Sequence, residues 1–111
     1  MKTGIDYIKE ERERQINEEG WTYERDDEYV NGQLAMAGAS YALPPLWRQN
    51  IAPDVNKPPY SWPWLDMWWK PTPEDRIKEL SKAGALIAAE IDRLLREKAN
   101  NFCETVLKKK E

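Results

Sequence analysis

The sequence predicts an all-α fold, a small helical bundle of three main helices with a long, ordered loop rich in proline and tryptophan. Three observations predict it. Apolar residues recur at helical spacing toward both ends of the chain, helix-capping residues precede these stretches, and all eight prolines fall within residues 44–73. A length of 111 residues suits one domain, so residues 1–111 are expected to form a single helical unit.

The first helix is expected over about residues 4–19. Thr3 can cap its N-terminus, and Asp6, three residues later, completes a capping-box-like pair. Gly20 suits the left-handed position that ends many helices. The apolar face of this helix is narrow and consists of Ile5, Ile8 and Ile16. Such a helix is marginal alone, so it must pack on the rest of the chain.

The second helix is expected over about residues 31–43, after a loop at 21–30. Asn31 is its predicted N-cap, and Pro44 and Pro45 end it because proline lacks the backbone N–H. Its small residues would allow close approach of another helix or of a ligand; they are Ala35, Ala37, Gly38, Ala39 and Ala42.

Residues 44–71 form the predicted loop. Five of the six tryptophans fall between Trp47 and Trp69. These side chains carry too much apolar area to remain in water, so the segment is expected to wrap over the helices in an ordered path. A short helical turn is expected at about Leu65–Trp69.

The third helix is expected over residues 72–98 or longer, with Thr72 as N-cap and Pro73 at the first helical position. Its apolar stripe has nearly heptad spacing: Ile77, Leu80, Gly84, Ile87, Ile91, Leu94 and Lys98, with Phe102 and Val106 as possible continuations. A helix of that length spans roughly 40 Å, which is long for so small a domain. We therefore expect this helix to contribute to the interface of a homo-oligomer, a dimer or higher; the alternative is a monomeric bundle whose loop covers the stripe.

Composition excludes several function classes. With 20 acidic and 17 basic residues the net charge is −3, which argues against binding a nucleic-acid polymer. The chain has no histidine, which excludes Ser-His-Asp and Cys-His catalysis and ordinary zinc sites. The single cysteine, Cys103, cannot form an internal disulfide. No apolar run approaches the ~20 residues of a membrane span and the start of the sequence lacks an apolar signal core, so a cytoplasmic protein without a membrane partner is expected.

Acidic pairs form one candidate site. Glu10 and Glu13 lie three residues apart on the first predicted helix, and Asp26 and Asp27 follow in the predicted loop. Carboxylates at such spacing can hold Mg²⁺, which polarises phosphates. The competing interpretation is a solvated helix face with local ion pairs. Asp26 and Asp27 could instead accept ribose hydroxyls beside Trp21 and Tyr23.

Aromatic and basic residues form a second candidate site. Trp62, Trp64, Trp68 and Trp69 offer flat faces on which a base can stack, and Lys70, Arg76 and Lys82 follow as partners for phosphate. One small region thus combines what a nucleotide-sized ligand requires. The competing interpretation is that the tryptophans supply core mass.

Several of these motifs together resemble a family of short proteins carried by tailed phages and prophages, most of them uncharacterised. The resemblance covers roughly residues 5–96. It lies in Trp21, Asp26-Asp27, Asn31–Ala35, Trp62-Pro63-Trp64, Trp68–Pro71 and Asp75–Leu94. The same pattern is similar to the N-terminal domain of phage dATP/dGTP diphosphohydrolase-type (MazG-like) proteins. It implies either Mg²⁺-dependent nucleotide hydrolysis or a counter-defence protein that captures a host nucleotide signal. Glu90-Ile91-Asp92 departs from the Glu-x-x-Asp pattern of the hydrolases, which favours binding.

We therefore expect a non-enzymatic nucleotide-binding protein of phage type, acting in the host cytoplasm, that sequesters a cyclic nucleotide or an ADP-ribose derivative. No catalytic residue, metal or cofactor is expected. The expected ligand-binding residues are Trp21, Tyr23, Asp26, Asp27, Trp62, Trp64, Trp68, Trp69, Lys70, Arg76 and Lys82. The first alternative is a Mg²⁺-dependent (d)NTP pyrophosphohydrolase using Glu10, Glu13, Asp26 and Asp27. The second is an interaction module that blocks a host protein.

Overall fold

The computed structural model describes residues 1–51 and 57–110, with the side chains of the last helix described as far as residue 104. The fold is all-α, as predicted, and these residues contain no strand. The helices are α1 (Gly4–Glu18), α2 (Tyr23–Asp26), α3 (Gln33–Ala42), α4 (Pro45–Asn50) and α5 (Arg76–Lys110), with a 3₁₀ turn, η1, at Asp66–Trp68. Residues 52–56 of the predicted loop and the side chain of Val106 lie outside the described residues.

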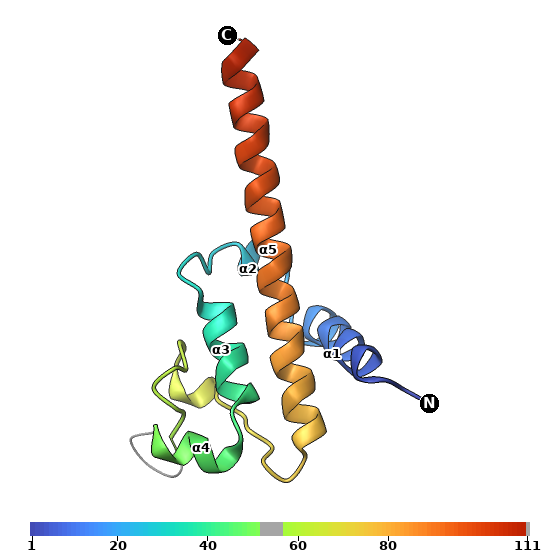
Figure 1. Cartoon of the computed structure of the whole chain (residues 1–111), viewed down its shortest axis with the longest axis vertical. Helices are drawn as coiled ribbons and strands as arrows, with labels where there is room; N and C mark the ends of the chain where they lie inside the picture. The colour runs from blue at the N-terminus through green and yellow to red at the C-terminus, as the bar shows by residue number, and fades with distance from the viewer. Residues whose placement is uncertain (52–56, 111) are drawn as a thin grey trace.

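Helix α5 is the axis of the molecule, with α3 and α1 on either side of its N-terminal half (Figure 1). Two glycines allow this close packing. A Cβ added to Gly38 would lie 3.2 Å from the carbonyl oxygen of Ala83, and one added to Gly84 would lie 2.5 Å from Ile8 Cδ1. Of the small residues in the second predicted helix, Ala37 and Gly38 are therefore buried on the side of α5, whereas Ala35 and Ala39 are exposed.

The core is small and lies between α3, α5 and residues 57–71, hereafter the tryptophan-rich segment. Its buried residues are Leu34, Ala37, Tyr41, Trp62, Ala83, Leu86 and Ala89, with Trp21, Tyr29, Ala42, Trp64 and Trp69 packed against them. Helix α5 thus contributes mainly alanines to the core. Because alanine adds little apolar area, much of the buried surface comes from the aromatic rings.

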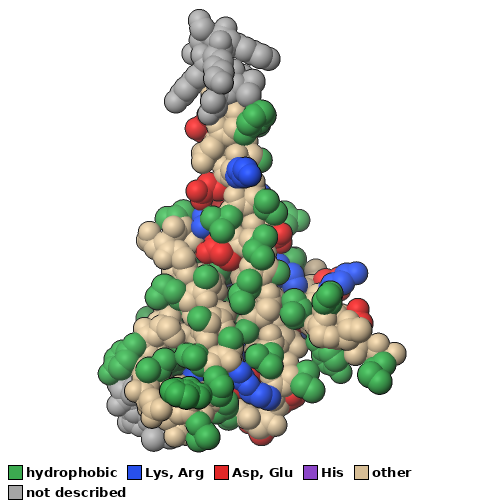
Figure 2. All heavy atoms as spheres, in the orientation of Figure 1, with side chains coloured by type: hydrophobic (Ala, Val, Ile, Leu, Met, Phe, Trp, Pro, Cys, Tyr) green, Lys and Arg blue, Asp and Glu red, His purple; other side chains and the backbone are tan. Residues whose placement is uncertain are grey.

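The apolar stripe of α5 does not enter this core. Five of its side chains remain 44–62% exposed: Ile77, Leu80, Ile87, Ile91 and Leu94. Ile5 of α1 is more exposed still, at 79%. The side chains of the stripe stay exposed because α1 and α3 pack on its two sides and do not cover its middle. Figure 2 shows hydrophobic side chains following α5 along this face. None of the helices in the described part of the chain is both long and apolar enough to span a membrane.

Several predicted helix ends are corrected. Helix α5 begins at Arg76 rather than at Thr72, and Asp75 caps it, with its Oδ1 accepting from the backbone N–H of Lys78 at 3.1 Å. Helix α3 begins after Gly32, whose φ of 81° is left-handed, so Asn31 is not the N-cap. The capping box of Thr3 and Asp6 is confirmed.

Short helices occupy segments that were expected to be loops. Thr22 caps α2, its hydroxyl accepting from the N–H of Arg25. Pro45, expected only to end the second helix, also starts α4 at its first position. The expected turn near Leu65–Trp69 is present as η1.

A buried ionic network joins α4, α5 and the chain that precedes α5. Glu79 is fully buried and accepts from Arg48 at 2.8 Å, from Arg76 at 3.0 Å and from the backbone N–H of Thr72 at 3.0 Å. Arg48 and Arg76 also donate to the carbonyl of Tyr41, at 3.3 and 2.9 Å. This network fixes both ends of the tryptophan-rich segment relative to α3.

Candidate functional site

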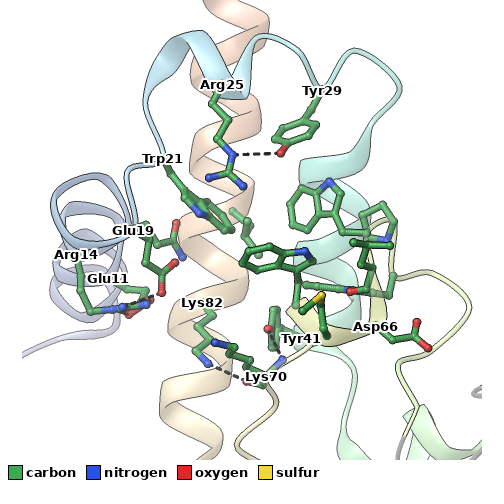
Figure 3. Close-up of a pocket in the computed structure, with 18 residues that line it drawn as sticks. Glu11, Arg14, Glu19, Trp21, Arg25, Tyr29, Tyr41, Asp66, Lys70 and Lys82 are labelled. Atoms are coloured by element: carbon green, nitrogen blue, oxygen red, sulfur yellow. Dashed lines mark hydrogen bonds and ion pairs between the residues drawn. The ribbon is translucent and has the colours of Figure 1, made fainter.

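A cavity of about 1200 Å³ opens beside α5 between α1 and the tryptophan-rich segment (Figure 3). In this view α1 lies to the left of α5 and α3 to the right, the reverse of Figure 1, so the cavity faces away from the exposed stripe. Its aromatic lining comprises Trp21, Tyr29, Tyr41, Trp62, Trp64 and Trp68. Its charged lining comprises Arg14, Arg25, Lys70, Lys82, Glu11, Glu19 and Asp66.

The aromatic wall is a chain of edge-on contacts centred on Trp64. The Trp64 ring lies 5.8 Å from Trp21 at an interplanar angle of 77°, 5.3 Å from Trp62 at 87°, and 5.1 Å from Tyr29 at 52°. Trp68, which also lines the cavity, is 54% exposed. None of the Trp64 contacts is a parallel stack, and Trp68 offers a flat ligand the most exposed ring of the wall.

Lys82 is the most enclosed cation of the cavity. Its Nζ donates to the carbonyl oxygen of Lys70 at 2.9 Å and lies 5.3 Å from the centroid of the Tyr41 ring. Burial lowers the pKa of Lys82, and the nearby positive charge of Lys78 lowers this pKa further. Lys70 is fixed beside it, because its backbone N–H donates to the Tyr41 hydroxyl at 3.2 Å.

A third cation lies at the other end of the aromatic wall. The Arg25 guanidinium is 5.8 Å from the centroid of the Trp21 ring, and its Nε donates to the Tyr29 hydroxyl at 3.4 Å. Figure 3 shows Arg25 at the top of the cavity and Lys70 and Lys82 at the bottom. Cations therefore flank the tryptophans on two sides.

Each carboxylate that lines the cavity is paired with a basic side chain. Glu11 and Glu19 both accept from Arg14, at 3.0 Å each, and Asp66 pairs with Lys57 at 3.4 Å. Among the described residues no carboxylate forms an ion pair with Arg25, Lys70 or Lys82. Because Glu11 and Glu19 share Arg14, the four cations and three carboxylates that line the cavity leave it a net charge of +1, with Arg25, Lys70 and Lys82 as the cations that an anion would meet.

Two polar atoms of the cavity wall lack a partner in the described chain. They are Trp64 Nε1, a donor, and Gln15 Oε1, an acceptor, and both are buried. Buried polar groups are normally hydrogen-bonded, so each of these atoms would gain from a partner inside the cavity.

The structure gathers six of the predicted ligand-binding residues around this cavity: Trp21, Trp62, Trp64, Trp68, Lys70 and Lys82. Trp69, Tyr23 and Arg76 lie outside its lining. Trp69 stacks on Tyr41 at 4.7 Å and Tyr23 lies under the Arg96 guanidinium, 5.3 Å from it. Arg76 belongs to the buried network of Glu79 and also donates to the carbonyl of Ala42.

Asp26 and Asp27 also lie outside the cavity and fasten α2 to its neighbours. Asp26 is fully buried and accepts from Arg12 of α1 at 3.2 Å. Burial raises the pKa of Asp26, while the positive charge of Arg12 opposes this rise. Asp27 pairs with Arg96 of α5 at 2.8 Å. Both carboxylates therefore have structural partners.

The carboxylates of the hydrolase alternative do not converge. Glu10 pairs with Lys2 at 3.0 Å on the surface of α1, whereas Asp26 is buried against Arg12. Within the described residues, no three His, Cys, Asp or Glu side chains are grouped so that they could hold a metal ion. The geometry therefore offers no support for a two-pair Mg²⁺ site.

Sequence reasoning missed part of the lining, namely Arg14, Gln15, Arg25, Tyr29 and Met67. Trp21 precedes α2 and lies in a segment expected to be a loop, so no helical spacing predicted its contact with Arg25. Tyr41 contributes to both the core and the cavity. The remaining residues have no sequence signal that separates them from ordinary surface residues.

Comparison of the chain with protein-family models, with curated proteins and with solved structures finds no match in any of the three. The resemblance to phage proteins therefore stays a prediction, and the function has to be argued from the cavity.

Proposed function

We propose that the protein binds a nucleotide in the tryptophan-lined cavity and sequesters it without converting it. One observation carries this proposal. A single cavity of about 1200 Å³ brings together Trp21, Trp64 and Trp68 with Lys70 and Lys82. Flat hydrophobic faces beside cations suit a ligand that has a heterocyclic base at one end and phosphate at the other.

The chemistry of the wall defines the expected contacts. A base stacked on an indole face gains ~1–3 kcal/mol. Lys70, Lys82 and Arg25 supply N–H donors for phosphate oxygens, and these charge-assisted bonds are stronger than neutral ones. Because cations lie at both ends of the aromatic wall, a dinucleotide or an ADP-ribose derivative fits the arrangement better than a mononucleotide does.

Binding without conversion follows from the groups that the cavity offers. The sequence has no histidine, and the cavity's carboxylates are held by Arg14 or Lys57. None of them is placed as a general base. A protein that holds a nucleotide signal without consuming it would lower the free concentration of that signal in the host. This is the counter-defence role expected from the phage resemblance.

Intrinsic tryptophan fluorescence tests the proposal. The titration panel is cyclic dinucleotides, ADP-ribose derivatives, ATP and AMP, with the uncharged nucleoside and inorganic phosphate as controls. We expect saturable quenching by one class of phosphorylated nucleotide and none by either control. Trp64→Phe should remove most of the signal, whereas Trp47→Phe, at a 65% exposed position outside the cavity, should not. No response to the panel at ~100 µM would overturn the proposal.

A second candidate function is supported by a different observation. Large apolar side chains are exposed on α4 and in the tryptophan-rich segment: Leu46, Trp47, Tyr60, Leu65 and Met67. Such a patch is typical of a protein–protein contact, as the interaction-module alternative requires. If capture of a host protein survives Trp64→Phe and fails with Trp47→Ser, the patch and not the cavity carries the function.

We also infer that the protein works as a homo-oligomer, because α5 leaves a continuous apolar face uncovered. No residue of this face lines the cavity. Each chain would therefore bind its ligand independently, with one ligand per chain.

A further inference from the structure

The exposed face of α5 is a single stripe that runs from the globular part of the chain into the projecting half of the helix. It consists of Ile77, Leu80, Ile87, Ile91, Leu94, Leu95 and Phe102, hereafter the α5 stripe. These side chains expose on the order of 700 Å² per chain, close to the ~800 Å² that each partner contributes to a standard stable interface. A monomer's largest apolar patch is usually no larger than ~300–600 Å².

We propose that a second copy of the chain covers the α5 stripe, with the two α5 helices antiparallel and related by a two-fold axis near Ile87 and Ile91. This inference gives the homo-oligomer proposed above its interface and orientation, and it does not rest on the proposed nucleotide binding, because the α5 stripe and the cavity share no residue. Three observations favour a second copy in this orientation.

The first observation is the spacing of the stripe. Apolar side chains lie about as far on one side of Ile87–Ile91 as on the other, from Ile77 to Phe102. In an antiparallel pair Ile87 then faces Ile91 of its partner, and Ile77 faces Phe102. Near-heptad spacing keeps the apolar faces of two long helices in contact along their length.

The second observation is the position of α1 and α3 on the flanks of α5. Gly84 is covered by Ile8 of α1, and Gly38 of α3 packs on Ala83, Leu86 and one side of Ile87. These flanking helices thicken the molecule near residues 83–87. In a parallel pair, α1 and α3 of one chain would lie beside α1 and α3 of the other. In an antiparallel pair, they lie beside the projecting C-terminal half of the partner's α5, which carries no flanking helix there. The projecting half is visible at the top of Figure 1.

The third observation is charge. Lys98 lies in the stripe, so a parallel pair would place two lysines at the same level of the seam. In an antiparallel pair Lys98 lies at the level of Leu80. There a shallow hollow between α1 and the start of α5 is lined by Glu10, Glu11 and Asp75 together with Arg14 and Lys78, so acidic side chains outnumber basic ones by one.

The test measures mass and orientation on the full chain. Light scattering at micromolar concentration should give twice the chain mass of 13.1 kDa. Cys103 is exposed, is the sole cysteine and lies off the stripe, so it accepts a spin label. The inter-label distance should be about 40 Å in the antiparallel pair, since each label is some fourteen residues from the axis, and about 20 Å in a parallel pair.

Substitutions locate the interface. Ile87→Glu should give a monomer at the same concentration with unchanged helix content, because Ile87 is already 44% exposed in the single chain. Asn100→Glu, an exposed position on the opposite side of the same helix, is the matched control and should remain dimeric. A monomeric wild-type chain, a label distance near 20 Å, or a dimer that Ile87→Glu leaves intact would each overturn the proposal. Nucleotide titration of Ile87→Glu separates it from the proposed function, since binding should be retained.

Discussion

Lys82 is the residue at which the electrostatics of the cavity are most specific. Its ammonium is held between the Lys70 carbonyl and the Tyr41 ring, and burial lowers the pKa of this lysine from its ordinary 10.5. A lysine with a lowered pKa gives up its proton at a lower pH than a solvated one. Its capacity to bind phosphate is therefore lost earlier as the pH rises.

We predict that affinity for the nucleotide found by titration falls as the pH rises through a value below 10.5, and that Lys82→Arg retains affinity over this range because arginine stays protonated. At neutral pH, Lys82→Met should weaken binding about tenfold, as loss of a charge-assisted hydrogen bond of ~1.5 kcal/mol would. Lys9→Met, an exposed position on α1 outside the cavity, serves as the control. Fluorescence titration across pH measures both effects; equal affinities for Lys82→Met and wild type would contradict the assignment.

Asp26 gives a pH dependence of stability with a defined sign. Burial raises the pKa of this carboxyl above 3.8, so the folded chain binds its proton more tightly than the unfolded chain does. Its contribution to stability is therefore present at low pH and is lost as the pH rises through the interval between 3.8 and the raised value. The partner Arg12 limits the loss.

We predict that Asp26→Asn removes this contribution while keeping an acceptor for Arg12. The free energy of unfolding of Asp26→Asn minus that of wild type should rise with pH above 3.8 and stay within about 1 kcal/mol at neutral pH. Asp26→Ala should cost more, about 3 kcal/mol, because Arg12 then lacks its buried partner. Urea unfolding at several pH values measures both differences. A difference that falls with pH would show that Arg12, not burial, dominates the titration of Asp26.

At the scale of elements, the contact of α1 with α5 depends on the absence of a side chain at Gly84. A Cβ there would lie 2.5 Å from Ile8 Cδ1 and 2.6 Å from Ile8 Cγ1, so α1 would have to move. Ile8 is β-branched and has little rotamer freedom in a helix, which limits relaxation.

We predict that Gly84→Ala destabilises the fold by about 1–2 kcal/mol, because the clash outweighs the ~1 kcal/mol that alanine gains over glycine in a helix. In the Ile8→Ala background the same substitution should be neutral or stabilising. A double-mutant cycle by urea unfolding measures this coupling, and additivity of the two substitutions would contradict the contact.

Sequence patterns predicted the long elements better than the short ones. The capping box at Thr3 and the period of α5 are local signals, so α1 and α5 could be found from the sequence. Helices α2 and α4 have four and six residues and depend on packing, which no local pattern reports. The sequence also did not predict which face of α5 is buried. The buried face carries alanines, whose hydrophobic signal is weaker than that of the isoleucines on the exposed face.

At the scale of the whole molecule, the cavity joins segments that are far apart in the sequence. Trp21 follows α1, Trp64 lies in the tryptophan-rich segment and Lys82 lies on α5. Composition indicated these residue types, and clustering indicated Trp62, Trp64 and Trp68. The separation of Trp64, which lines the cavity, from Trp69, which packs on Tyr41, is a property of tertiary structure. The same holds for Arg76, whose charge is used by Glu79.

Helix α5 divides into a packed half and a projecting half, and this division yields the last prediction. In the described chain, the ion pairs that join α5 to other helices end at Arg96, which pairs with Asp27 at the end of α2.

A chain ending at Arg96 should therefore keep its fold and its nucleotide affinity. It should lose self-association, because Lys98 and Phe102, which lie at the level of the partner's Leu80 and Ile77 in the proposed dimer, are gone. The melting temperature of the full chain should rise with protein concentration, as for a dimer, and that of the shortened chain should not. A shortened chain that still dimerises would move the interface from the α5 stripe to the exposed apolar patch around α4, and a shortened chain that unfolds would show that the projecting half stabilises the monomer.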